Sequence, residues 1–300
     1  MKKHKLTAWL AAAAAGLSML GGTLPQAAVT ASAAGNCQME YLDRGISAIN
    51  TGSGMLVSWR FLANDSDSAV FQLYRNNTLI YTSNAGESTC YLDGSGKSTD
   101  QYRVDTVENG KVVSTSNCTM ISNQNYFQIN LDPPTGSGCT YSPNDCSVGD
   151  VDGDGMYEIF MKWDPSNSKD NSQKGKTGNV FIDCYRLDGT RLWRIDLGKN
   201  IRAGAHYTQF FVADFDCDGK AEMTCKTADG TVDGKGKVIG DASKDYRNSN
   251  GYVLSGPEYY TLFDGSTGAA LDTVNYEPSR GTVSKWGDSY GNRVDRFWGT

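Results

Sequence analysis

The sequence is poor in several residue types that common functions require. It has two histidines, seven prolines and a formal charge of −6 over 300 residues. Its cysteines show no Cys-x-x-Cys spacing of the kind found in zinc sites. An acidic chain does not suit nucleic acid or anionic membranes. The sequence therefore argues against a zinc domain, a nucleic-acid binder or a membrane-surface protein.

Long apolar runs are confined to the N-terminus. Lys2, Lys3 and Lys5 precede an apolar stretch at 6–20, and the small residues Ala-Ser-Ala follow at 31–33. This order predicts a secretory signal peptide over residues 1–33, because a membrane span would need a stop-transfer pattern. We therefore expect a secreted, extracellular protein with no membrane partner.

Eight cysteines in an exported chain predict disulfide bonds. Their spacing alone leaves many pairings open. Proximity along the chain favours a bridge between Cys90 and Cys118 and another between Cys139 and Cys146.

The composition indicates an all-β protein, because glycine and tyrosine are abundant and few segments have helical periodicity. Residues 38–122 predict a small β-domain with Trp59 in its core. Expected strands cover 56–60, 70–75, 102–107 and 111–113, the last two joined by Asn109-Gly110. Short strands at this spacing resemble a fibronectin type III β-sandwich.

Two acidic loops with identical spacing follow this domain. Residues 150–158 read Asp-Val-Asp-Gly-Asp-Gly-Met-Tyr-Glu, and residues 214–222 read Asp-Phe-Asp-Cys-Asp-Gly-Lys-Ala-Glu. Crowded carboxylates repel one another unless a cation lies among them, and Ca²⁺ prefers oxygen ligands. The predicted ligands are the side chains at loop positions 1, 3, 5 and 9 and the carbonyl at position 7: Asp150, Asp152, Asp154, Met156, Glu158, Asp214, Asp216, Asp218, Lys220 and Glu222.

These loops differ from EF-hands. An EF-hand needs a bidentate acid at position 12, where this chain has Met161 and Cys225. The segments 157–163 and 221–227 favour strands over helices. A solvated turn would explain one acidic loop, but two copies with the same spacing favour metal binding.

Residues 123–300 contain a repeated pattern. Each calcium loop is followed by a strand and then by a hairpin, with turns at Asp188-Gly189 and Asp264-Gly265. A repeated antiparallel unit predicts the first blades of a β-propeller, which this chain is too short to close. We therefore expect an incomplete propeller.

Long polar and aromatic connectors separate the expected strands, and such loops commonly carry binding residues. Trp, Tyr, Asn, Asp and Arg side chains suit a sugar. The segments at 146–155, 162–172, 201–210 and 286–297 together resemble the family 11 polysaccharide lyases, the rhamnogalacturonan lyases. The resemblance runs from about residue 38 to residue 297 and covers the N-terminal portion of such an enzyme.

This resemblance implies an eight-bladed, calcium-stabilised propeller behind the small β-domain. It also implies β-elimination at the rhamnose–galacturonate bond of rhamnogalacturonan I, a plant cell-wall pectin. Substrate contacts transfer by motif to Asn144 and Asp164, although Pro143 departs from the usual alanine beside Asn144.

The catalytic base is not assigned from the sequence. Arg202 and His206 are candidates, since a cation can neutralise a uronate carboxylate and a base must remove the C5 proton. His206 could instead have a structural role, and Arg202 could pair with a loop acid. A non-catalytic calcium-binding propeller that holds carbohydrate or protein remains the alternative function.

Overall fold

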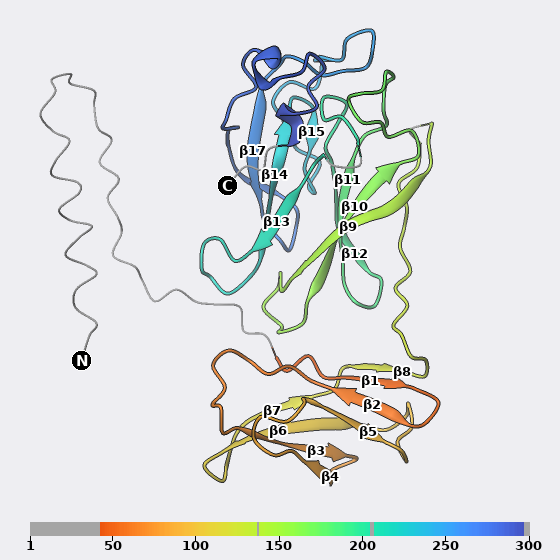
Figure 1. The fold of residues 1–300 in the computed structure, drawn as a ribbon, viewed down its shortest axis with the longest axis vertical. Coiled ribbons are helices and arrows are strands. Elements are labelled where there is room, and N and C mark those ends of the chain that lie inside the picture. The colour runs from red at the N-terminus through yellow and green to blue at the C-terminus, as the bar shows by residue number, and fades with distance from the viewer. Residues whose placement is uncertain (1–42, 137, 205–206, 297–300) are drawn as a thin grey trace, which may run out of the picture. The chain divides into compact units, whose positions relative to one another are not determined.

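The computed structural model describes residues 43–136, 138–204 and 207–296 (Figure 1). These residues form an all-β fold of four sheets, with two short 3-10 helices near the end of the described chain. The expected all-β class is thus confirmed. The predicted signal peptide lies outside the described residues. Within the described residues, no helix is both long and apolar enough to cross a membrane.

The first two sheets pack around one core. One sheet has the order β5-β2-β1-β8 and the other β4-β3-β6-β7. Their strands are β1 (Ser47–Asn50), β2 (Met55–Ser58), β3 (Val70–Arg75), β4 (Thr78–Thr82), β5 (Cys90–Asp93), β6 (Tyr102–Glu108), β7 (Lys111–Asn117) and β8 (Met120–Ser122). Met55 and Val57 of β2 alternate with less buried neighbours. They share a core with Leu73 and Val104 of the other sheet, as strand periodicity requires.

The third and fourth sheets are built from the repeated part of the sequence. The third has the order β16-β15-β12-β11-β10-β9 and the fourth β13-β14-β17-β18. Their strands are β9 (Tyr141–Gly149), β10 (Glu158–Pro165), β11 (Phe181–Tyr185), β12 (Arg191–Asp196), β13 (Phe210–Ala213), β14 (Glu222–Ala228), β15 (Thr231–Val232), β16 (Val238–Ile239), β17 (Glu258–Phe263) and β18 (Ala270–Asn275). The helices are η1 (Val283–Trp286) and η2 (Val294–Arg296).

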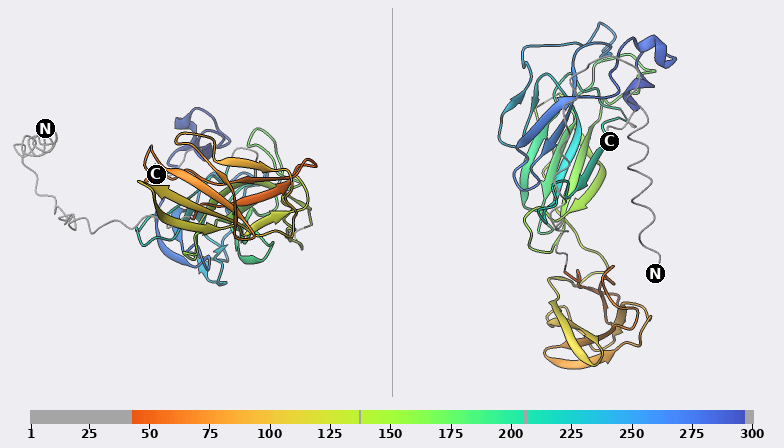
Figure 2. Two further views of the ribbon diagram at one scale, coloured as in Figure 1. Left: turned by 90° about the horizontal axis from the view of Figure 1, so that it is seen from below. Right: turned by 90° about the vertical axis from the view of Figure 1, so that its left-hand side faces the viewer.

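One core joins the third and fourth sheets, which lie side by side in both orientations (Figures 1 and 2). Phe160 and Ile195 of the third sheet and Met223 and Phe263 of the fourth are all fully buried in it. Trp193 of β12 donates a hydrogen bond from its indole nitrogen to the Gly265 carbonyl, at 2.7 Å. Apolar packing and this hydrogen bond therefore hold the two repeats together.

Most predicted strands are present, but some were missed. The expected strand at 70–75 matches β3, the strand expected before the Asp264-Gly265 turn is β17, and Trp59 is buried as predicted. The sequence pattern predicted no strand before either acidic loop, so β9 and β13 were missed. Each missed strand pairs with the strand that follows the acidic loop and forms an edge of its sheet.

The two preferred disulfides are wrong. Cys90, Cys118 and Cys146 are free thiols, so neither the Cys90–Cys118 nor the Cys139–Cys146 bridge forms. Cys217, within the second acidic loop, is disulfide-bonded. Closeness in sequence was a poor guide, because the register of the paired strands, and not the separation along the chain, decides which side chains lie next to one another.

Candidate metal loops and carbohydrate site

The first acidic loop connects β9 to β10 and organises its own backbone. The buried Asp150 carboxylate accepts hydrogen bonds from the Gly153 and Gly155 amides at 2.7 and 2.8 Å. Glu158 accepts one from the Val151 amide at 3.0 Å. Both glycines have positive φ, a conformation that disfavours residues with a Cβ. The loop is therefore a closed turn with the carboxylates of Asp150 and Glu158 buried, whereas that of Asp154 is exposed.

The second loop, between β13 and β14, repeats this geometry. Asp214 accepts hydrogen bonds from the Asp218 and Gly219 amides at 3.1 and 2.9 Å. Glu222 accepts one from the Phe215 amide at 2.9 Å. Cys217 has a φ of 64° at the position that Gly153 occupies in the first loop. The two loops thus share a backbone path as well as a sequence pattern.

Each loop brings three predicted ligands together. Oxygens of Asp150, Asp152 and Glu158 lie within 4.8 Å of one another, as do those of Asp214, Asp216 and Asp218. These clusters could hold a metal ion. Asp154 and Glu222 lie outside these trios, and the carbonyls of Met156 and Lys220 stay predicted ligands. Arg186 makes an ion pair of 2.7 Å with Asp152, which places one protein cation at the first loop.

The electrostatics of both loops favour a cation. Burial, with a smaller contribution from the nearby carboxylates of Asp152, Asp154 and Asp150, raises the pKa of Glu158 to about 7, although the hydrogen bond from the Val151 amide lowers it. The pKa of Glu222 is also raised to about 7, for the same reasons. A cation among the oxygens would remove this penalty on the ionised form. The residues present therefore fit a hard divalent ion.

The predicted substrate residues lie on the paired strands β9 and β10. Trp163 pairs with Pro143, and Met161 pairs with Cys146. The two β9 residues between these pairs therefore lie opposite the single β10 residue Lys162, which makes a β-bulge. Asn144 is exposed in this bulge, and its side-chain oxygen accepts a hydrogen bond from the Asp145 amide. β-Bulges redirect side chains, and here the bulge presents Asn144 to solvent.

Asp164 lies one residue beyond the bulge and is partly exposed, with its carboxylate accepting a hydrogen bond from the Ser168 hydroxyl at 2.9 Å. Because it follows the bulge on the strand paired with β9, Asp164 belongs to the same region as Asn144. The substrate-binding role of both residues stays a prediction.

Lys162 is a site residue that sequence reasoning missed. Its buried side chain forms an ion pair of 2.6 Å with Asp145 and donates to the Tyr207 carbonyl at 3.3 Å. The lysine therefore ties the bulge to the segment beyond Arg202. A lysine in the middle of an otherwise buried strand was the available signal, since lysine is rarely buried without a partner.

Arg202 is buried and bonded to backbone. Its guanidinium donates to the carbonyls of Gln173, Gly175 and Gly251 at 2.6–2.8 Å, which joins three loop segments. His206 lies outside the described residues. The catalytic roles suggested for these two residues remain predictions.

Comparison with known proteins decides the family. The family model described as rhamnogalacturonan lyase family 11, C-terminal domain, matches residues 126–300. This chain belongs to rhamnogalacturonan lyase family 11. The model of the rhamnogalacturonan I lyase beta-sheet domain matches residues 37–121 of the same family 11 chain. The resemblance inferred from the sequence is confirmed.

Two curated relatives of this family 11 chain come from Bacillus subtilis (strain 168). Rhamnogalacturonan endolyase YesW is 58% identical over 266 residues, covering 87% of this chain and 43% of the relative. Rhamnogalacturonan exolyase YesX is 54% identical and covers 87% of this chain and 44% of the relative. The chain thus spans less than half the length of either curated relative.

Solved structures of family members agree with the fold. The crystal structure of rhamnogalacturonan lyase YesW has a TM-score of 0.81 and 57% identity, covering 86% of this chain and 45% of that one. The structure of the exotype lyase YesX has a TM-score of 0.80 and 54% identity, covering 86% of this chain and 44% of that one. The fold of this family 11 chain is therefore that of rhamnogalacturonan lyase structures.

Proposed function

We propose that this chain forms part of a secreted, calcium-dependent rhamnogalacturonan lyase that cleaves rhamnogalacturonan I by β-elimination. The observation that carries the proposal is the pair of family matches, which together span residues 37–121 and 126–300. Both curated relatives are named as rhamnogalacturonan lyases. The N-terminal segment over residues 1–33 supports export as a signal peptide.

The proposed fold assigns a fibronectin type III-like β-domain to residues 38–122 and the first blades of a propeller to residues 123–300. Two consecutive antiparallel units that share a core support the propeller assignment. The first two sheets, packed around a single core, support the sandwich assignment.

The proposed chemistry breaks the C4–O bond of a galacturonate residue. A base takes the C5 proton, the electron pair forms the C4=C5 double bond, and the rhamnose oxygen leaves. The residues of the two acidic loops would hold the calcium, whose positive charge would offset the repulsion among their carboxylates and stabilise the loops. Asn144 and Asp164 bind sugar hydroxyls, because an amide can donate and accept while a carboxylate accepts.

The test follows the ultraviolet absorbance of the unsaturated uronate while the chain is incubated with rhamnogalacturonan I and calcium. We expect absorbance to rise with calcium and to stop rising with chelator. Asn144→Ala and Asp164→Asn should reduce the rate, whereas the matched control Asp272→Asn, an exposed acid on β18, should not. A rise that persists unchanged in both site variants would refute their assignment.

A second function is favoured by one observation: the chain covers only 43% and 44% of the two curated relatives. A catalytic cleft can require residues from the remaining length. In that case the 300 residues act as a non-catalytic calcium-binding module that retains carbohydrate. Slower migration in a rhamnogalacturonan gel, together with a flat absorbance trace, would select this function over the lyase.

A further inference from the structure

A cluster of buried charges lies beside the fourth sheet, away from the two acidic loops. Lys226 of β14 forms ion pairs with Glu258 at 2.9 Å and Asp295 at 3.3 Å. Arg280 pairs with the same two carboxylates, through one terminal nitrogen, at 2.5 and 2.6 Å. Asp295 also accepts a hydrogen bond from Asn171 at 2.7 Å. All four charged side chains are at least 86% buried.

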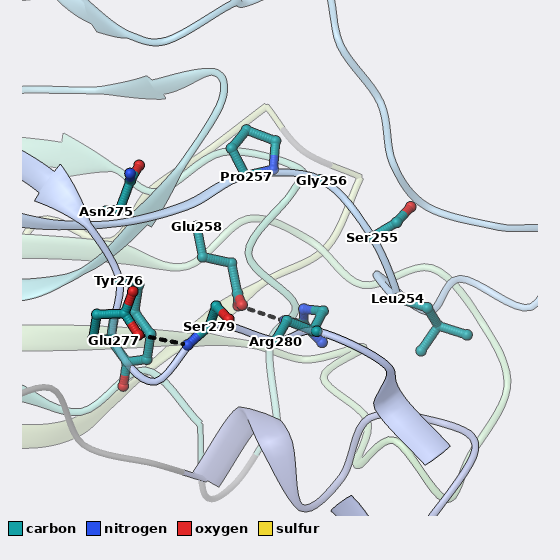
Figure 3. Close-up of a pocket in the computed structure, with 11 residues that line it drawn as sticks. Leu254, Ser255, Gly256, Pro257, Glu258, Asn275, Tyr276, Glu277, Ser279 and Arg280 are labelled. Carbon is teal, nitrogen blue, oxygen red and sulfur yellow. Dashed lines mark hydrogen bonds and ion pairs between the residues drawn. The ribbon is translucent and has the colours of Figure 1, made fainter. Parts of the chain in front are cut away.

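Two cavities adjoin this cluster. The larger one, of about 400 Å³, is shown in Figure 3, where the Glu258–Arg280 ion pair lies on its wall. The smaller one has a volume of about 20 Å³. Glu258 and Arg280 line both cavities, so their ion pair forms a shared wall. The residues of the smaller cavity that bear on binding are Arg202, Thr208, Lys226, Glu258, Arg280 and Asp295.

Three residues that line the smaller cavity, Arg202, Thr208 and Arg280, carry buried donor atoms that lack a protein partner. Among the described residues, no acceptor meets Nε of Arg202, Oγ1 of Thr208, or Nε and Nη1 of Arg280. Buried polar groups normally have hydrogen-bond partners, so unpartnered donors on three residues of one cavity wall require an explanation. Arginine nitrogens can only donate. The missing partner must therefore accept several hydrogen bonds.

The charges that line the cavity favour an anion over water. They comprise three cations, Arg202, Lys226 and Arg280, and two carboxylates, Glu258 and Asp295. Asp170 lies within electrostatic range of Arg202 but does not line the cavity. A water molecule accepts at most two hydrogen bonds, whereas a monatomic anion accepts from every side. A cavity of about 20 Å³ exceeds the 10–15 Å³ that one water-sized occupant needs.

We propose that the cavity between Arg202, Thr208 and Arg280 is a binding site for one small monovalent anion of the chloride type. The anion accepts hydrogen bonds from the unpartnered donors and offsets the net positive charge of the residues that line the cavity. Arg202 also bonds carbonyls of two other loop segments, one containing Gln173 and Gly175 and one containing Gly251, so the anion stabilises the position of these loops. This site is separate from the acidic loops and does not depend on the proposed lyase activity.

Diffraction from crystals grown with bromide in place of chloride tests the site directly. We expect an anomalous peak in the cavity within hydrogen-bonding distance of Arg202 and Arg280. Ordinary water density without anomalous signal, or an empty cavity, would overturn the proposal. This experiment uses the unaltered 300-residue chain and so does not depend on the folding of any variant.

Thermal unfolding provides the solution test. Calcium is held constant as its gluconate salt, and chloride or bromide replaces gluconate at fixed ionic strength, because charge screening would otherwise confuse the result. We expect Tm to rise by about 2–4 °C at five times the Kd of the anion. Equal Tm values in chloride, bromide and gluconate would refute anion binding.

Two substitutions at Thr208 assign the effect to this cavity. Thr208→Ala removes the hydroxyl donor, whereas Thr208→Ser keeps it, and both face the same backbone φ of 64°. We expect the halide-dependent rise in Tm to weaken in the alanine variant, with at least a threefold increase in Kd, and to persist in the serine variant. An unchanged Kd in Thr208→Ala would place the anion elsewhere and overturn the assignment.

Discussion

From the acidic loops we predict that calcium stabilises this chain. Replacing one loop carboxylate by an amide of the same shape should remove part of that stabilisation. The changes are Asp152→Asn and Asp216→Asn. In each loop this carboxylate oxygen accepts an amide hydrogen bond, from Asp154 at 3.3 Å and from Asp218 at 3.1 Å respectively. Asparagine keeps that oxygen and removes the charge. The substitution therefore separates metal binding from turn formation.

The expected magnitude follows from the oxygen spacing. Two unit charges 4.8 Å apart repel by roughly 3.5 kcal/mol at an effective dielectric constant of about 20. Together with burial, which is the larger cause, this repulsion raises the pKa of Glu158 to about 7. Calcium at about 100 times Kd stabilises the folded state by about 2.7 kcal/mol. For a chain of this size that is about 5–10 °C in Tm.

Scanning calorimetry with calcium and with chelator measures the effect. In calcium, each asparagine variant should show a smaller rise in Tm than the unaltered chain. In chelator, Asp216→Asn should be as stable as the unaltered chain or more stable, because one repelling charge is gone, whereas Asp152→Asn also loses the partly exposed ion pair with Arg186, worth about 0–1 kcal/mol. The exposed Asp272→Asn serves as the matched control. If chelator leaves Tm unchanged, or if the variants lose the same stability with and without calcium, the metal-site reasoning is wrong.

Three further predictions concern stability. In chelator, the raised pKa values of Glu158 and Glu222 mean that the folded state binds more protons than the unfolded state. These two groups therefore make the urea midpoint fall as pH rises from about 4.5 to 7. A urea midpoint that rises over that pH window in the unaltered chain, but not in variants with Gln at these positions, would contradict the shifts. Trp193→Ala should cost about 3–5 kcal/mol in urea unfolding, because the indole is buried and bonded to the next repeat; a loss below about 1 kcal/mol would show that the two sheets do not depend on it. Gly265→Ala should destabilise by about 1–3 kcal/mol, because its Cβ would lie 1.8 Å from the Ala221 carbonyl; an unchanged urea midpoint would contradict that close approach.

The repeated sequence pattern predicted much of the fold because its signals are local. Alternating burial in β2 and β17, the turn residues between hairpin strands, and the glycines of the acidic loops each act within a few residues. The missed strand β9 lacks such a pattern, since it contains Pro143 and a bulge. Its pairing with β10 stabilises it in the tertiary structure.

The sequence by itself determined the all-β class, the family and the spacing of the acidic loops, because these depend on residue order and short-range backbone preferences. Only the tertiary structure decided that Lys162 ties β9 to Tyr207, and that Arg202 lies buried against three carbonyls. It also decided that four cysteine side chains expected to pair do not form the expected bridges. The charged cluster of Lys226, Glu258, Arg280 and Asp295 spans 69 residues of sequence. Contacts of this range depend on how the sheets and loops pack, which no local pattern records.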